Sequence, residues 1–182
     1  GQEGPYAARP AYDDLIQGLT ALPALTGRIT GEPRYSPATM ADRIVGLNAV
    51  HAILAALFHR ERTGEGQAIE IPMFETMAQF VLGDHMAGRS FDPPIGPPGY
   101  SRLLSPDRRP YQTSDGYICA LVYSDKQWNA FFAKIGLADE ADRDPRLNSI
   151  SARTRNYDFV YDWFSQMMKT RSTAEWMHFF AE

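Results

Sequence analysis

The longest apolar stretch of the chain, Ile44 to Phe58, has hydrophobic residues on nearly every side of a helix. It contains Asn48 and His51, and its length of about 15 residues is short of the roughly 20 that a membrane span needs. Cationic residues and then Gly64 follow it, as is typical of a helix C-terminus. We therefore predict a helix that begins near Met40 and lies buried at the centre of a soluble protein.

The pattern around this helix predicts further elements in the first half of the chain. Apolar residues at helical spacing favour helices over Ala11–Leu19 and Phe74–Ala87. Glycines and prolines indicate a loop over Ala21–Ala38. Alternating apolar residues indicate a strand over Ala68–Met73, and Pro72 places it at a sheet edge or a strand end.

The composition changes over Gly88–Pro110. The core of this segment, FDPPIGPPGYSRLLSPDRRP, holds six prolines and two glycines. Since each X-Pro step disfavours helix, we interpret residues 89–110 as an extended interdomain linker. The linker joins a large-domain segment with the central helix, residues 1–88, to a small α+β domain segment, residues 111–182.

The second half of the chain opens with the apolar run Tyr117–Tyr123, which predicts a buried strand. Cys119 lies inside this run and is expected to be inert packing. The elements expected after it are a helix from Ser124 or Asp125 to Ile135 stopped by Gly136, an acidic loop over Ala138–Arg146, an amphipathic helix over Ser151–Lys169 and a last helix opened by the capping box Ser172–Glu175.

Composition narrows the class of protein. The 182 residues suggest one large domain or parts of two, and 44% hydrophobic residues are ample for a core. The net charge is −4 and no basic stripe is present, which argues against nucleic acid as a partner. With one cysteine and no visible signal peptide or membrane span, we expect a cytoplasmic protein. The histidines and the cysteine lack metal-ligand spacing, so we expect no metal.

Asp42, at the front edge of the central helix, is the candidate for chemistry. One interpretation is an N-cap, since Asp is among the best residues there. The other is a reactive carboxylate: Gly46 and Ala49 share its helix face and leave room for a substrate, and the helix dipole favours a negative nucleophile. His51 is half a turn out of phase and cannot form an acid–base pair with Asp42.

Two other pairs of adjacent charged residues have both a functional and a structural interpretation. Asp13 and Asp14 could be paired catalytic carboxylates, but consecutive helical residues point about 100° apart, which favours simple partners of the helix dipole. Arg108 and Arg109 could hold a ligand phosphate, although a solvated pair is favoured.

Four sequence blocks follow one another along nearly the whole chain. They are RPAYDDLIQG (Arg9–Gly18), ADRIVGLNAVHAILAALFHRERTGEGQ (Ala41–Gln67), IEIPMFE (Ile69–Glu75) and PYQTSDGYICALVYSDKQW (Pro110–Trp128). Together they resemble successive blocks of the family III CoA-transferases, the CaiB/BaiF type that includes formyl-CoA and carnitine CoA-transferases.

The resemblance implies an α/β fold: part of a Rossmann-like large domain, mainly helical here, joined by the Pro-rich linker to a small α+β domain. Two chains of that family interlock as rings in a homodimer. By this comparison the sequence is a fragment that lacks the family's N-terminal and C-terminal parts. Both ends also look cut, since the chain starts without Met and stops within a helical pattern.

The same resemblance implies a site and a reaction. Asp42 matches the catalytic aspartate, which exchanges CoA between an acyl-CoA and a carboxylic acid through aspartyl-anhydride and aspartyl-CoA intermediates. Coenzyme A is thus the expected co-substrate. The residues matched to CoA binding are Ala11, Tyr12, Asp13, Met73 and, in place of the family's glycine loop, Gly99.

Two alternatives stay open. The related α-methylacyl-CoA racemases use an Asp–His pair, but Tyr12 stands where the His would be, and tyrosine, with an unperturbed pKa of about 10, is a poor base at pH 7. The other alternative is a non-catalytic fragment that keeps the fold for assembly.

Overall fold

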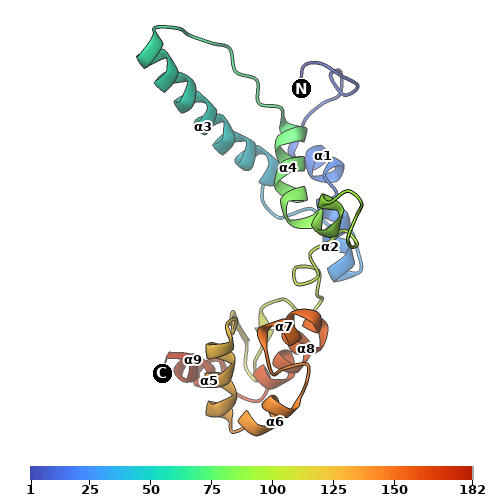
Figure 1. Ribbon diagram of the computed structural model, residues 1–182, viewed down its shortest axis with the longest axis vertical. Helices are drawn as coiled ribbons and strands as arrows, with labels where there is room; N and C mark the ends of the chain where they lie inside the picture. The colour runs from blue at the N-terminus through green and yellow to red at the C-terminus, as the bar shows by residue number, and fades with distance from the viewer. Residues whose placement is uncertain (182) are drawn as a thin grey trace. The chain divides into compact units, whose positions relative to one another are not determined.

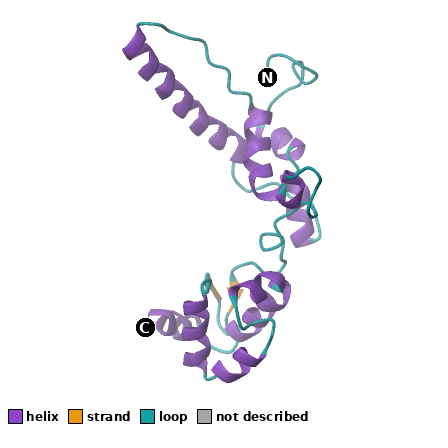
Figure 2. Ribbon diagram, viewed as in Figure 1, coloured by secondary structure: helices purple, strands orange, loops and turns teal. Residues whose placement is uncertain are grey.

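The computed structural model describes residues 1–181, which divide into two compact units. The N-terminal unit comprises Gly1–Tyr100 and the C-terminal unit begins at Ser101. Helices dominate both units, and the described residues contain one sheet, of two short strands (Figure 2). The predicted mainly helical character of the chain is confirmed, with a small sheet beside the helices, but residues 1–181 contain no Rossmann-like parallel sheet.

The N-terminal unit is built from four α-helices and a short 3₁₀ helix (Figure 1). They are α1 (Asp13–Leu19), α2 (Leu22–Thr30), α3 (Met40–Thr63), α4 (Met73–His85) and η1 (Ala87–Ser90). Helix α2 occupies part of the predicted loop Ala21–Ala38. Pro23 in its first turn is compatible with a helix start, and Gly31, at a φ of 87°, ends it.

The core of the N-terminal unit forms where α1, α3 and α4 meet. Its buried residues are Ile16, Ala41, Val45, Met77 and Val81. Ile16, Met77 and Val81 lie at the helical spacing predicted for α1 and α4. Helix α3 is apolar on nearly every side, so periodicity does not indicate that Ala41 and Val45 form its buried face.

Helix α3 is not the buried central helix that its composition predicts. Only Ala41 and Val45 are buried, whereas Leu54 and Phe58 are 59% and 64% exposed. Figure 1 shows most of α3 extending beyond α1 and α4. The prediction fails because an apolar helix is buried only where other elements pack against it. Within residues 1–181, α1 and α4 pack against the first turns of α3 alone.

The length and composition of α3 would also suffice for a membrane crossing, with a mean hydropathy of 1.4 in its most apolar window. This is weak evidence, because core helices of soluble proteins meet the same criterion. The helix ends as predicted, with Gly64 at a φ of 79° and its N–H bonded to the Arg60 carbonyl.

The predicted strand over Ala68–Met73 is wrong. The segment before α4 forms no ladder within the described residues, and Met73 is instead the first residue of α4. A strand is stabilised by backbone hydrogen bonds to a neighbouring strand. Pro72 has no backbone N–H and cannot donate such a bond.

The Pro-rich segment folds back on α4 as far as Tyr100. The N–H of Gly99 donates to the His85 carbonyl at 2.8 Å, and the N–H of Ile95 donates to the Gly88 carbonyl at 3.1 Å. Gly88 and Gly96 pack backbone against backbone, since a Cβ on Gly88 would lie 2.5 Å from the Gly96 Cα. The division between the units thus falls within the segment 89–110.

The C-terminal unit combines a hairpin with five helices. These are β1 (Tyr111–Gln112), β2 (Tyr117–Ile118), α5 (Asp125–Ile135), α6 (Ala138–Arg143), α7 (Ile150–Arg155), α8 (Tyr157–Met168) and α9 (Thr173–Ala181). The strands are antiparallel, with Tyr111 opposite Ile118. Aromatic side chains fill the core: Trp128 and Phe131 of α5, Phe164 of α8 and Trp176 of α9 are all buried.

The predicted helix ends of this unit are confirmed. Ser124 and Gln127 form a reciprocal capping box at the start of α5, and Gly136, at a φ of 76°, ends that helix. At the start of α9, the Glu175 carboxylate accepts hydrogen bonds from the N–H and hydroxyl of Ser172, as its capping-box pattern predicts.

Three predictions for this unit need correction. The run Tyr117–Tyr123 pairs only as far as Ile118, and its side chains alternate between covered and exposed, so Cys119 is exposed rather than buried. The predicted helix over Ser151–Lys169 is broken at Asn156 into α7 and α8. The acidic loop over Ala138–Arg146 contains the short helix α6. In each case packing determined details that periodicity does not encode.

Candidate active site

Asp42 is the third residue of α3, not its N-cap. The cap position belongs to Thr39, whose side chain makes no capping hydrogen bond. The N-cap interpretation of Asp42 is therefore wrong. The Asp42 side chain is exposed, and within residues 1–181 its carboxylate accepts no hydrogen bond and forms no ion pair.

Asp13 supplies the cap that α3 lacks locally. Its Oδ1 accepts hydrogen bonds from the backbone N–H groups of Ala41, at 2.7 Å, and Asp42, at 3.2 Å. These N–H groups belong to the first turn, which has no partner inside the helix. Asp13 thus ties the start of α1 to the start of α3 and fixes the backbone that carries Asp42.

Gln17 completes this arrangement, although the sequence analysis did not identify it. The side chain is fully buried; its Nε2 donates to Asp13 Oδ2 at 2.6 Å, and its Oε1 accepts from the Ser36 N–H at 2.9 Å. It holds the second Asp13 oxygen and the loop before α3. The available signal was its spacing, since a residue four positions after Asp13 lies on the same face of α1.

The helix face that carries Asp42 is open. A Cβ placed on Gly46, one turn further along, would meet no heavy atom within 4 Å. The aligned peptide dipoles of α3 favour negative charge at this end of the helix. A carboxylate that is exposed, without an internal partner and beside a glycine can approach an electrophile directly, as nucleophilic catalysis requires.

The other predicted site residues lie at three places in the N-terminal unit. Ala11 and Tyr12 directly precede α1 and are exposed, and the hydrogen bonds of Asp13 bring them to the start of α3. Met73, the first residue of α4, packs against the hydrophobic cluster that contains Ala41 and Val45. Gly99 lies elsewhere, beside the C-terminal end of α4, where its φ of 105° favours glycine.

The described residues hold no group of three or more His, Cys, Asp or Glu side chains placed to bind a metal ion.

Comparison with known proteins gives a match over the whole chain. The family model for CoA-transferase family III matches residues 1–182. The succinate–glutarate CoA-transferase of Agrobacterium fabrum is 33% identical over 84% of this chain and 38% of its own length. The acetyl-CoA:oxalate CoA-transferase of Acetobacter aceti is 28% identical over 97% of this chain and 46% of its own length.

Solved structures resemble the chain in fold. A CaiB/BaiF family protein from Brucella suis superimposes with a TM-score of 0.67 and 29% identity over 100% of this chain and 48% of its own. A protein from Mycobacterium tuberculosis gives a TM-score of 0.74 at 23% identity, over 98% and 46% of the two chains. The chain thus spans less than half the length of these relatives.

Proposed function

The chain belongs to CoA-transferase family III, and from this premise we propose that the protein carrying it moves CoA from an acyl-CoA to a carboxylic acid with Asp42 as nucleophile. One observation supports the role of Asp42 most directly. Its carboxylate is exposed and unpaired within residues 1–181, while Asp13 holds the backbone beneath it.

The proposed reaction proceeds in four exchanges. An Asp42 oxygen attacks the thioester carbonyl, forming an acyl–aspartyl anhydride and releasing the CoA thiolate. The thiolate attacks the aspartyl carbonyl, which releases the donor acid and leaves an aspartyl-CoA thioester. The acceptor carboxylate attacks this thioester to give a second anhydride and free thiolate. The thiolate then attacks the acceptor's acyl carbon, forming the new acyl-CoA and regenerating Asp42. Covalent catalysis divides one difficult exchange into easier steps.

Ala11, Tyr12, Met73 and Gly99 remain the proposed contacts of CoA. Asp13 takes a different part in this proposal. Because both of its oxygens accept hydrogen bonds, from the start of α3 and from Gln17, we assign it to positioning Asp42 rather than to touching CoA.

The relatives guide the choice of substrates. Two of the relatives cited above are named for succinate and glutarate and for oxalate, so we propose a dicarboxylic acid as donor or acceptor. We also propose that the protein forms a homodimer, as the family resemblance implies. We propose that it is cytoplasmic, because its single cysteine fits a reducing compartment. Size-exclusion chromatography with light scattering on the natural protein would measure its oligomeric state.

The decisive experiment traps the covalent intermediate. The natural protein is incubated with succinyl-CoA, treated with neutral hydroxylamine and digested, and its peptides are analysed by mass spectrometry. The expected product is a hydroxamate on Asp42. Replacing Asp42 with Ala should remove the adduct and lower kcat by about a thousandfold or more, as loss of a nucleophile does.

Asp14→Ala is the matched control, because Asp14 is an exposed acid of the neighbouring helix start and should keep the adduct. Full activity of the Asp42→Ala variant would refute the proposal. Exchange of the α-proton with deuterated water, without transfer of CoA, would instead identify a racemase.

A further inference from the structure

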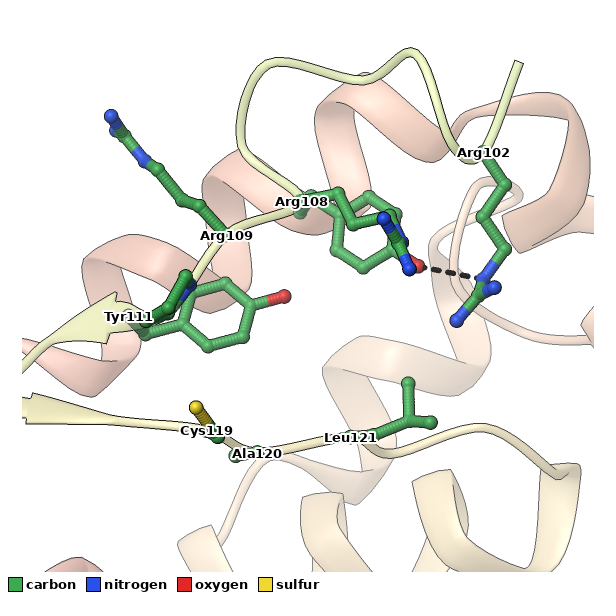
Figure 3. Close-up of a pocket in the computed structure, with 9 residues that line it drawn as sticks. Arg102, Arg108, Arg109, Tyr111, Cys119, Ala120 and Leu121 are labelled. Carbon is green, nitrogen blue, oxygen red and sulfur yellow. Dashed lines mark hydrogen bonds between the residues drawn. The ribbon is translucent and has the colours of Figure 1, made fainter. Parts of the chain in front are cut away.

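The C-terminal unit contains a pocket of about 350 Å³, separate in sequence from every residue discussed at Asp42. The segment Ser101–Pro110 contributes one wall with Arg102, Arg108 and Arg109 (Figure 3). The extended residues Cys119–Leu121 line the opposite side. The pocket therefore combines a cationic wall with a mainly apolar floor.

The charge in this pocket is unbalanced. Three arginines line it and no carboxylate does, although the chain as a whole has a net charge of −4. The negative charge that acts on the pocket is that of Asp107, which adds to burial in raising the pKa of Tyr111. Arg109 is partly neutralised, because it forms an ion pair with Asp107 at 3.0 Å, and Figure 3 shows its guanidinium pointing away from Arg102 and Arg108.

Arg102 and Arg108 differ from Arg109, since their charges act on both phenols of the pocket. Each lowers the pKa of Tyr111 and of Tyr161 against the larger effect of burial. The Nε of Arg102 donates to the Tyr161 hydroxyl at 3.0 Å. Within residues 1–181 the Arg108 guanidinium forms no hydrogen bond and no ion pair. Arg102 and Arg108 thus both act on the phenols of this pocket, and an anion bound beside these phenols could accept charge-assisted hydrogen bonds from guanidinium groups.

The two tyrosines add hydrogen-bond donors. Tyr111 is 4% exposed, its hydroxyl points into the pocket in Figure 3, and it makes no hydrogen bond within the described residues. Burial raises the pKa of both phenols, so they keep their protons at physiological pH. The ring of Tyr111 is buried while its hydroxyl opens into the pocket, so this hydroxyl can donate a hydrogen bond to an anion bound there.

We propose that Arg102, Arg108 and the Tyr111 hydroxyl bind the carboxylate or phosphate group of an anionic ligand whose hydrocarbon part lies along Ala120 and Leu121. Guanidinium groups bind both kinds of oxyanion with charge-assisted hydrogen bonds. This proposal rests on the proposed function only in naming the molecule that carries the bound oxyanion. That molecule is either a dicarboxylic acid substrate or CoA, through one of its phosphates.

The test measures binding of inorganic phosphate, glutarate and coenzyme A to the 182-residue chain by titration calorimetry. Arg108→Gln and Tyr111→Phe should each weaken binding by about tenfold, as expected for loss of a hydrogen bond to a charged group. Arg109→Gln, which removes the same charge one residue away, should change affinity by less than about threefold. Circular dichroism verifies that each variant is folded.

Cys119 offers a second readout, since it lines the pocket and is the chain's single cysteine. A bound ligand should slow its reaction with a thiol reagent, and Arg108→Gln should abolish this protection. Binding of glutarate alone identifies the acid as the source; binding of phosphate and CoA without glutarate identifies CoA.

The proposal is overturned if the folded chain binds none of the three probes, or if Arg108→Gln binds them as tightly as the unmodified chain. Asp42→Asn separates this result from the proposed function. In the natural protein, this replacement should abolish CoA transfer, because the proposed function makes Asp42 the nucleophile. It should leave anion binding unchanged, because Asp42 does not line this pocket.

Discussion

Asp13 and Asp42 belong to different helices, and the Asp13 carboxylate accepts a hydrogen bond from the Asp42 backbone N–H at 3.2 Å. The same oxygen accepts the N–H of Ala41 at 2.7 Å. One acid therefore caps the helix that presents the other. Because Asp13 caps α3, the Asp42 carboxylate has no capping role within the described residues and can act as a nucleophile.

Replacing Asp13 with Ala should destabilise the N-terminal unit by about 2 kcal/mol, because the first turn of α3 loses two hydrogen bonds to a charged acceptor. Thermal unfolding measures the change. Asp14→Ala is the control: Asp14 also begins α1 but accepts no side-chain hydrogen bond within residues 1–181, so its loss should cost less than about 1 kcal/mol. Equal losses would show that Asp13 does not act as a tertiary cap.

Gly46 should show opposite effects on stability and activity. A Cβ there meets nothing within 4 Å, so Gly46→Ala should stabilise α3 by roughly 0.5–1 kcal/mol through helix propensity. If a substrate must reach Asp42 across this face, the same change should lower kcat/KM several-fold in the natural protein. Gly83→Ala, equally unhindered in α4, should stabilise without a loss of activity. An unchanged kcat/KM for Gly46→Ala would contradict substrate approach at this face.

The sequence predicted those features that neighbouring residues determine by themselves. The Ser124 capping box and the glycines after α3 and α5 are local hydrogen-bond and backbone effects, and all were confirmed. The position of Asp42 at the front of α3 also follows from the pattern of its own segment. Such features need no knowledge of what packs against them.

Long-range relationships were not predictable. The bond between Asp13 and the start of α3 joins residues far apart in the chain, so no local pattern encodes it. The exposure of Leu54 and Phe58 depends on which elements surround α3, and composition cannot report that. Gln17 was overlooked for a related reason: a polar residue on a short helix suggests solvent until its partners are known.

Gly88 and Gly96 test the folded-back conformation of the Pro-rich segment. A Cβ on Gly88 would lie 2.5 Å from backbone atoms of Gly96, which cannot move away as a flexible side chain would. Gly88→Ala should therefore destabilise the N-terminal unit by about 1–3 kcal/mol, measured by denaturant unfolding. Gly96→Ala is the matched control, because a Cβ there is 3.8 Å from Gly88. Similar stabilities of the two variants would contradict this close backbone contact.

Acid should weaken the C-terminal unit through Asp115 and Glu175. Asp115 Oδ1 accepts hydrogen bonds from the Thr173 N–H at 2.7 Å and the Thr173 hydroxyl at 3.0 Å, which lower the pKa of Asp115 from its ordinary 3.8. The Ser172 hydroxyl and N–H likewise lower the pKa of Glu175 from 4.5. A carboxyl whose pKa is lower in the folded state stabilises that state above its unfolded value. This contribution is lost as pH falls through the folded value.

The Tm should accordingly begin to fall near pH 4.5 and continue to fall below pH 3.8, the ordinary values of the two groups. Asp115→Asn should lower the Tm at pH 7 and make the decline in acid shallower, since a carboxamide cannot be protonated in this range. Differential scanning calorimetry from pH 7 to pH 3 measures both effects. Asp142→Asn, at an exposed acid of α6, should leave the profile unchanged. An Asp115→Asn profile parallel to that of the unmodified chain would mean that the hydrogen bonds from Thr173 contribute nothing to acid stability.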